Sequence, residues 1–277
     1  VSVALSGDAG DELFGGYNRY FWGPRIWAKL AWIPYSMRQI LGSAIRAMPI
    51  AGWDTLNRSI NTLLNSSDGF MRVGEKAHNL ANRLHSVRNV DDLYLSLLSK
   101  WQDPAQVVRG ESSFNVFEPS SVLDDELPGD VLNNFENCAL RMMYRDSMMY
   151  LPDDILCKVD RAAMAVSLET RVPFLDHRVA ELAWRLPLNM KIRAGKGKWA
   201  LRQVLYKHVP RQLIERPKAG FGIPIGDWLR GPLRVWAENL LDQNRLNAEG
   251  YFHSVPIRRK WAEHVSGKCN HTDSLWT

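Results

Sequence analysis

Helical periodicity, interrupted by prolines, is the feature that most constrains what this chain can fold into. Apolar residues recur every three or four positions over residues 24–48 and 53–64, and Pro34 and Pro49 break the pattern. We predict packed helices over these ranges. Only residues 1–5 form a strand-like apolar run, so any parallel sheet of the complete protein is expected to lie mostly upstream. The predicted fold is predominantly α with one N-terminal strand.

The centre of the chain predicts further helices. A polar stretch at 109–126 is followed by Pro128-Gly129-Asp130, which marks the start of a helix over 131–151. Methionine fills irregular gaps well, so four methionines of this helix are assigned to the core rather than to a ligand cleft: Met142, Met143, Met148 and Met149. Later helices are predicted at 154–168, from the cap Asp176 to Leu186, at 198–208 and at 232–241.

The composition excludes several classes of protein. A hydrophobic content of 45% predicts a real core, and 35 basic against 30 acidic residues, with no run of five like charges, do not imply nucleic-acid binding. The apolar region at 30–50 is broken by prolines and arginines, so no membrane-spanning helix is predicted. Cys138, Cys157 and Cys269 lie far apart without histidine partners, which predicts neither a zinc site nor disulfides and favours a reducing, cytoplasmic location.

The stretch SGDAGDELFGG at 6–16 raises a question of charge. Its glycines predict a strand, a tight turn and a helix start, yet it holds three carboxylates, Asp8, Asp11 and Glu12, and no lysine. One interpretation is a Mg²⁺-phosphate site, in which the cation separates the negative groups. The other is that Asp8 caps a helix whose first turn holds Asp11 and Glu12. Both stay open on these residues alone.

Two further segments have an unusual charge content. Charged residues interrupt the apolar helix and turn at 151–177, and these charges must pair with each other, face water or meet a ligand. In RPKAGFGIPIGDWLRG, residues 216–231, Lys218 stands between a proline and two glycines, where a lysine suits capture of a departing phosphate. GKGKW at 195–199 lacks the spacing of a phosphate loop and is interpreted as the loop before a helix.

Taken together, these segments resemble one family, the glutamine-dependent asparagine synthetases. SGDAGDELFGGY, LPDDILCKVDRAAMAVSLETRVPFLDHR, GKGKWALRQVL and RPKAGFGIPIGDWLRGPLR occur in that family's order and spacing. The resemblance implies that residues 1–277 are the C-terminal helical portion of an α/β PP-loop synthetase domain. The family's glutaminase domain and its SGGxDS loop are missing from this sequence, and Asp8 stands where many members have glutamate.

The resemblance also implies an activity and its residues. Such enzymes use ATP and Mg²⁺ to convert aspartate into β-aspartyl-AMP, which ammonia from glutamine then attacks to give asparagine. By the resemblance, Ser6 and Gly7 approach ATP, Asp8 serves formation of the adenylate, Asp11 binds Mg²⁺ and Lys218 meets the phosphates. Candidates for a substrate or structural network are Lys158, Asp160, Arg161, Glu169 and Arg171.

Two alternatives to this activity stay open: an enzyme with a different acyl substrate, and a protein without catalytic activity. One is a related enzyme that amidates another carboxylate, such as a sugar uronate or a β-amino acid that cyclises, and the other is a non-catalytic regulatory paralogue. The expected partners are the upstream glutaminase domain and PP-loop segment, with a homodimer suggested by the resemblance and neither nucleic acid nor membrane involved.

Overall fold

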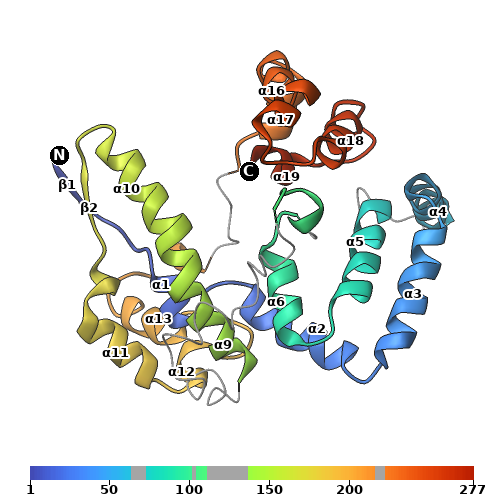
Figure 1. Ribbon diagram of the computed structural model, residues 1–277. Coiled ribbons are helices and arrows are strands. Elements are labelled where there is room, and N and C mark those ends of the chain that lie inside the picture. The colour runs from blue at the N-terminus through green and yellow to red at the C-terminus, as the bar shows by residue number, and fades with distance from the viewer. Residues whose placement is uncertain (64–72, 102–103, 111–136, 216–221) are drawn as a thin grey trace. The chain divides into compact units, whose positions relative to one another are not determined.

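The computed structural model describes residues 1–63, 73–101, 104–110, 137–215 and 222–277 (Figure 1). The chain divides into two compact units. Unit 1 comprises Val1–Trp32 and Glu126–Lys218, and unit 2 comprises Ile33–Asp125 and Ala219–Thr277. The described residues are mostly helical, which confirms the predicted fold class. None of their helices combines the length and apolar character needed to cross a membrane.

Unit 1 contains a two-stranded parallel sheet and a set of short helices. The strands are β1 (Val3–Leu5) and β2 (Glu169–Arg171), with Val3 opposite Glu169 and Leu5 opposite Arg171. The other elements are α1 (Gly10–Phe14), α2 (Arg19–Leu30), α9 (Cys138–Arg145), the π-helix η2 (Asp146–Leu156), α10 (Cys157–Met164), η3 (Pro173–Leu175), α11 (His177–Arg185), α12 (Leu188–Lys191), α13 (Trp199–Leu205) and α14 (Arg211–Ile214).

The core of unit 1 lies directly behind the turn between β1 and α1. Its fully buried members are Ala9, Leu13, Phe14, Leu151 and Ala183. The rings of Phe14 and Phe174 meet edge to face with centroids 5.8 Å apart. Burial of these apolar groups therefore fixes α1, and with it the acidic turn, against η2, η3 and α11.

A π-helix replaces the helix break expected near Pro152. Residues 138–164 run on as α9, η2 and α10, with Pro152 inside η2. Proline lacks an N–H and clashes with the carbonyl of an α-helical turn, and the wider π turn relieves that conflict. The spacing of a π turn also differs from that of an α turn, so the methionine assignment is only half right: Met142 and Met143 are buried, but Met148 and Met149 are exposed. The expected start at Pro128-Gly129-Asp130 and the polar stretch 111–126 lie outside the described residues.

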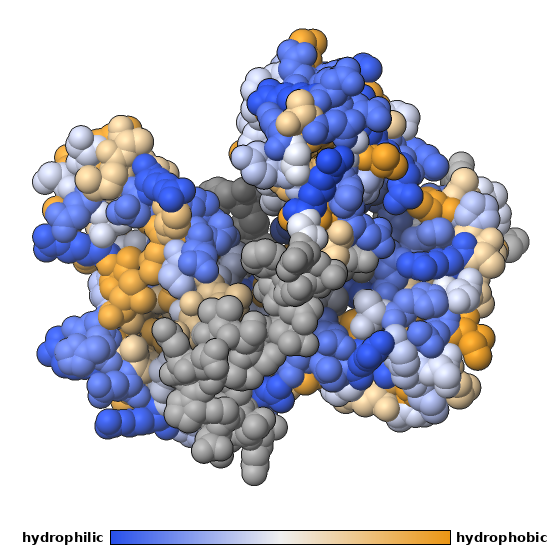
Figure 2. Space-filling model, viewed as in Figure 1, coloured by the Kyte–Doolittle hydropathy of each residue, from blue (hydrophilic) through white to orange (hydrophobic). Residues whose placement is uncertain are grey.

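The helix expected to reach residue 168 ends at Met164. Ser167 adopts the left-handed conformation, with φ 58°, and the chain then enters β2. This second strand was not predicted, because ETR has no apolar alternation of its own and becomes a strand only by pairing with β1. Apolar side chains stay exposed around this part of unit 1, among them Leu5, Met164 and Val166 (Figure 2).

Unit 2 is built of helices in its described part, with one isolated antiparallel β-bridge between Val108 and Phe252. Helix α5 (Val73–Ser86) packs against α3 (Tyr35–Ala47) and α4 (Ile50–Leu63), as Figure 1 shows. Pro34 and Pro49 immediately precede α3 and α4, which confirms both predicted breaks. The remaining elements are α6 (Val90–Leu98), η1 (Pro104–Gln106), α15 (Ile225–Arg230), α16 (Arg234–Leu240), α17 (Gln243–Glu249), α18 (Ser254–Val265) and α19 (Thr272–Trp276).

Candidate functional site

The acidic turn joins β1 to α1, as predicted, but Asp8 does not cap the helix. Ala9 is the N-cap residue of α1, in the left-handed conformation with φ 65°, and no side chain caps this helix. The Asp8 carboxylate instead accepts a hydrogen bond from the Ser6 hydroxyl. The helix-cap interpretation of Asp8 is therefore wrong, and its carboxylate lies on the partly exposed side of the turn.

The three carboxylates of the stretch occupy different environments. Glu12 is 1% exposed and accepts a hydrogen bond from the Tyr17 hydroxyl at 2.7 Å. Burial raises the pKa of the Glu12 carboxyl above its ordinary value, although the Tyr17 hydrogen bond opposes the shift. Asp8 and Asp11 are only partly buried. Two carboxylates, rather than three, are thus placed where a cation or ligand can reach them.

A lysine distant in the sequence meets the acidic turn. Lys198 Nζ lies 2.9 Å from Asp11 Oδ2, with the side chains 32% and 26% exposed. Lys198 occupies the N-cap position of α13, also left-handed with φ 56°, and its backbone N–H donates to Phe14 O at 3.0 Å. GKGKW is therefore the loop before a helix, as predicted, but it also supplies a cation to Asp11 that sequence reasoning missed.

Two glycine positions let these segments approach closely. A Cβ at residue 16 would lie 1.9 Å from Asp11 Oδ1, and a Cβ at residue 197 would lie 2.1 Å from the carbonyl oxygen of Gly15. A side chain at residue 16 would therefore displace the Asp11 and Lys198 side chains, and one at residue 197 would clash with the backbone. The glycines of FGGY and GKGKW thus hold Lys198 against Asp11, and the spacing of GKGKW before an apolar helix was the only local signal of this contact.

A buried polar network supports the turn from behind. Asp146 is fully buried, accepts a hydrogen bond from Arg19 Nε at 2.8 Å and another from the Tyr20 hydroxyl. The Arg19 guanidinium also lies 4.1 Å from the centre of the Tyr17 ring. This network was not predicted. Its only sequence signal is an aspartate that stands between two methionine pairs assigned to the core.

Of the two residues expected to approach ATP, Ser6 is hydrogen-bonded within the protein and Gly7 is open to solvent. The Ser6 N–H donates to Arg171 O at 2.8 Å, which continues the β1–β2 ladder, and the Ser6 hydroxyl is bonded to Asp8. Gly7 is exposed, and a Cβ built there would meet no atom within 4 Å. The backbone of Gly7 is therefore open to close approach by a ligand.

The other charged candidates lie on exposed surfaces of unit 1. Lys158 pairs with Asp154 at 3.9 Å, and Arg171 pairs with Glu169 at 2.7 Å. Asp160 and Arg161 are exposed on α10. The structure connects one member of this set to the turn, through the backbone of Arg171 beside Ser6.

Two expectations concern residues outside the turn, Lys218 and the cysteines. Lys218 lies outside the described residues. The statement that the cysteines lack histidine partners is wrong for Cys269, because one ligand atom each from Glu263, Cys269 and His271 lie within 4.8 Å of one another. Folding of the segment after α18 brings these residues together, which a search for CxxC or HxxxH spacing does not detect. The three cysteines are not disulfide-bonded, as expected.

Comparison with known proteins gives a consistent result. A family model described as asparagine synthase matches residues 1–277. The chain is 30% identical to glutamine-hydrolyzing asparagine synthetase 1 of Bacillus subtilis (strain 168), over 100% of this chain and 39% of that protein. It is 31% identical to a putative asparagine synthetase of Mycobacterium bovis, over 100% of this chain and 38% of the relative. The chain thus spans about two fifths of the length of these relatives. No solved structure gives a significant match.

Proposed function

The chain belongs to the asparagine synthase family, and on that premise we propose that it forms the C-terminal part of a synthetase domain that converts aspartate to asparagine at the expense of ATP. The curated relatives that cover the whole chain carry the name asparagine synthetase, which supports aspartate as the acyl substrate. We further propose that the glutaminase domain and the PP-loop belong to other parts of the same protein, and that it acts in the cytoplasm.

The observation that carries the proposal is the separation of charges at the acidic turn. Glu12 is buried and satisfied by Tyr17, whereas Asp8 and Asp11 stay partly exposed beside the open backbone of Gly7. A turn built only to begin a helix would not need Lys198 drawn from a distant loop to balance Asp11. The arrangement suits a phosphate ligand that reaches Asp8 and Asp11 through a divalent cation, because carboxylates alone would repel phosphate oxygens.

The donor set of the turn fits a hard divalent cation. Asp8 and Asp11 offer carboxylate oxygens, the ligands that Mg²⁺ prefers, and the Asp11 oxygen held by Lys198 is only partly buried. We propose that Asp11 is the ligand in this chain. A bound Mg²⁺ would neutralise negative charge on the phosphates of ATP.

The remaining residues have proposed roles in binding and positioning. Gly7 allows the backbone to approach the nucleotide, Ser6 orients Asp8 through its hydroxyl, and Asp8 assists formation of the acyl-adenylate. Lys218 is proposed to stabilise charge on the departing pyrophosphate. Lys198 holds Asp11 in position before any ligand arrives.

The exposed sheet supports the proposed domain organisation. A pair of parallel strands normally lies inside a larger sheet with both faces covered, but the Leu5 side chain on β1 is 76% exposed. Further strands beside β1 and β2, together with the helices that connect them, would extend the sheet and cover this apolar face. We propose that they come from the segment that carries the PP-loop.

Carboxylate-dependent exchange of pyrophosphate into ATP tests this function. The protein from the complete gene is incubated with labelled pyrophosphate, ATP, Mg²⁺ and one carboxylate at a time: aspartate, a β-amino acid or a sugar uronate. We expect exchange with aspartate alone, and asparagine when ammonia is added. Exchange with a different carboxylate would show that this compound, and not aspartate, is the acyl substrate. ATP binding without exchange for any carboxylate would overturn the proposal.

A further inference from the structure

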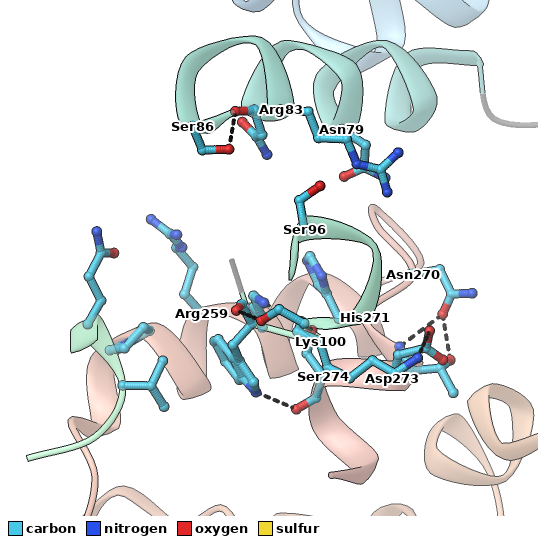
Figure 3. A pocket seen from close by; sticks show the side chains of 18 of the residues that line it. Asn79, Arg83, Ser86, Ser96, Lys100, Arg259, Asn270, His271, Asp273 and Ser274 are labelled. Atoms are coloured by element: carbon cyan, nitrogen blue, oxygen red, sulfur yellow. Dashed lines mark hydrogen bonds and ion pairs between the residues drawn. The ribbon is translucent and has the colours of Figure 1, made fainter. Parts of the chain in front are cut away.

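Unit 2 contains a cavity of about 810 Å³ that the proposed reaction does not use. Figure 3 shows Asn79, Arg83 and Ser86 of α5 on one side of it, facing Ser96, Lys100 and the segment 270–274 across open space. Cavities of this volume accept ligands of about nucleotide size. The cavity therefore has the dimensions of a small-molecule site.

Hydrogen bonds between distant segments fix the floor of the cavity. Trp101 Nε1 donates to Ser274 O at 3.0 Å, and the Ser274 hydroxyl donates to Lys100 O at 2.8 Å. Lys100 Nζ also lies 3.3 Å from Asp273 Oδ2. Lys100 and Trp101, which follow α6, thus form one wall with the C-terminal segment around Ser274. The cavity is therefore part of the folded unit.

Positive charge is in large excess around this space. Among the lining residues that the structure describes, Asp273 is the one carboxylate, and it already pairs with Lys100. The lining cations are Arg46, Arg83, Lys100, Arg259 and Lys260. Arg46 is bonded to the neutral Asn82, and among the described residues no carboxylate forms an ion pair with it. Like charges gathered at one cavity repel, so their convergence favours a counter-charge from a ligand.

Two of these cations are poorly solvated. Arg83 Nε is buried and has no hydrogen-bond partner among the described residues. Burial lowers the pKa of Arg83 below its ordinary value. Lys260 Nζ lies 3.5 Å from the centre of the Trp101 ring, and burial, together with neighbouring Arg259, lowers its pKa to about 8. Lys260 Nζ donates to Ser274 Oγ at 3.1 Å, so the unsatisfied donor is Arg83 Nε. Its burial costs free energy, which an anion beside the guanidinium would offset.

Neutral side chains complete the lining. Asn79 contributes an amide on the same side as Arg83, whereas the hydroxyls of Ser86 and Ser96 already donate to Asn82 O at 3.1 Å and Leu93 O at 2.7 Å (Figure 3). Guanidinium forks, ammonium groups, amides and hydroxyls are the groups that hold phosphate oxygens, and several cations together favour more than one phosphate charge. We propose that this cavity binds a small molecule bearing an oligophosphate group, at a second site whose residues are separate from those of the acidic turn.

Tripolyphosphate binding, measured by isothermal titration calorimetry, tests the site without an activity readout. The protein from the complete gene is titrated without Mg²⁺ at two salt concentrations. We expect binding that weakens with salt, and a loss of roughly 10- to 100-fold in Arg83→Gln and Arg259→Gln, as for a lost hydrogen bond to a charged group. Arg259 is exposed, so its variant keeps the test valid even where Arg83→Gln fails to fold.

Two further variants serve as controls. Arg88→Gln removes the same charge from an exposed position of unit 2 that does not line the cavity, and Asp11→Asn alters the proposed catalytic turn. Both should retain wild-type affinity for tripolyphosphate. Equal losses in Arg88→Gln and Arg259→Gln, tighter binding of citrate than of tripolyphosphate, or no binding to the wild-type protein would overturn the proposal. If the wild-type protein binds tripolyphosphate but shows no exchange activity with any carboxylate, the result would count against the proposed function alone.

Discussion

Lys198 Nζ and Asp11 Oδ2 lie 2.9 Å apart, although the two residues are far apart in the sequence of unit 1. Asp11 belongs to the first turn of α1 and Lys198 is the N-cap residue of α13, and the glycines at 16 and 197 allow the two segments to meet. The pair is partly exposed, so its contribution to stability is small and its importance lies in positioning.

Asp11→Asn in the protein from the complete gene should abolish exchange of pyrophosphate into ATP while leaving the fold intact, because an amide is a poorer ligand for a hard cation. Lys198→Gln should reduce exchange less, since Asp11 keeps its charge. Exchange assays and thermal melting measure both effects. Equal losses in the two single variants and the double variant would show that Asp11 acts only through Lys198.

Gly7→Ala and Gly197→Ala separate ligand approach from packing. A Cβ at residue 7 meets no atom within 4 Å, whereas a Cβ at residue 197 would lie 2.1 Å from Gly15 O. Gly7→Ala should keep the melting temperature and weaken ATP binding, and Gly197→Ala should lower the melting temperature. Unchanged ATP affinity in Gly7→Ala would remove the backbone of Gly7 from the nucleotide site.

Tyr17→Phe should destabilise unit 1 by about 1–3 kcal/mol, because the buried Glu12 carboxylate loses its hydroxyl donor. Urea denaturation measures the change. The matched control is Tyr206→Phe, which removes a hydroxyl that donates to Glu215 at 2.6 Å on the surface. We expect a much smaller loss for the control, and similar losses in the two variants would contradict the supporting role of the Glu12 network.

Lys191→Met should stabilise the protein at neutral pH. Lys191 is fully buried, its Nζ has no hydrogen-bond partner among the described residues, and burial lowers its pKa from 10.5 to about 8. Below pH 8 both folded and unfolded chains hold the proton, so the burial penalty is complete, at most about 3 kcal/mol. Between pH 8 and 10.5 the unfolded chain binds more protons, and wild-type stability therefore rises with pH.

The stability advantage of Lys191→Met should accordingly shrink from pH 8 to pH 10.5. Urea denaturation at several pH values measures this difference. Lys207→Met, at an exposed position of the same unit, is the control and should show no such trend. A constant advantage across this range would mean that Lys191 does not titrate there, and part of the penalty would then be offset by the Trp184 ring, 4.5 Å from Nζ.

Lys218→Ala should lower kcat for amide synthesis by roughly 10²–10³, the usual effect of losing one electrostatic donor, with a smaller change in the KM for ATP. Lys218→Arg should not restore the rate fully, because a planar fork does not replace a point charge. Lys196→Ala is the control, since Lys196 pairs with Glu215 at 2.8 Å on the surface. A higher KM with unchanged kcat would assign Lys218 to ground-state binding.

Local sequence determined the elements of this protein that depend on neighbours in the chain. Apolar spacing and prolines placed α3 and α4, the Asp176 side chain caps α11 as predicted, and an apolar run followed by glycines gave β1, the turn and α1. These features arise from backbone conformations and hydrogen bonds within a few residues, so the order of residues is enough to find them.

Only the tertiary structure decided which groups meet. The strand β2 exists because β1 pairs with it. Glu12 is the buried carboxylate because α1 turns that face toward Tyr17. Lys198 reaches Asp11 because glycines in both segments let the two backbones pack closely. The cationic cavity of unit 2 likewise joins α5 to the segment 270–274. Local periodicity carries no information on these pairs, since their free energy comes from packing between segments that are distant in the chain.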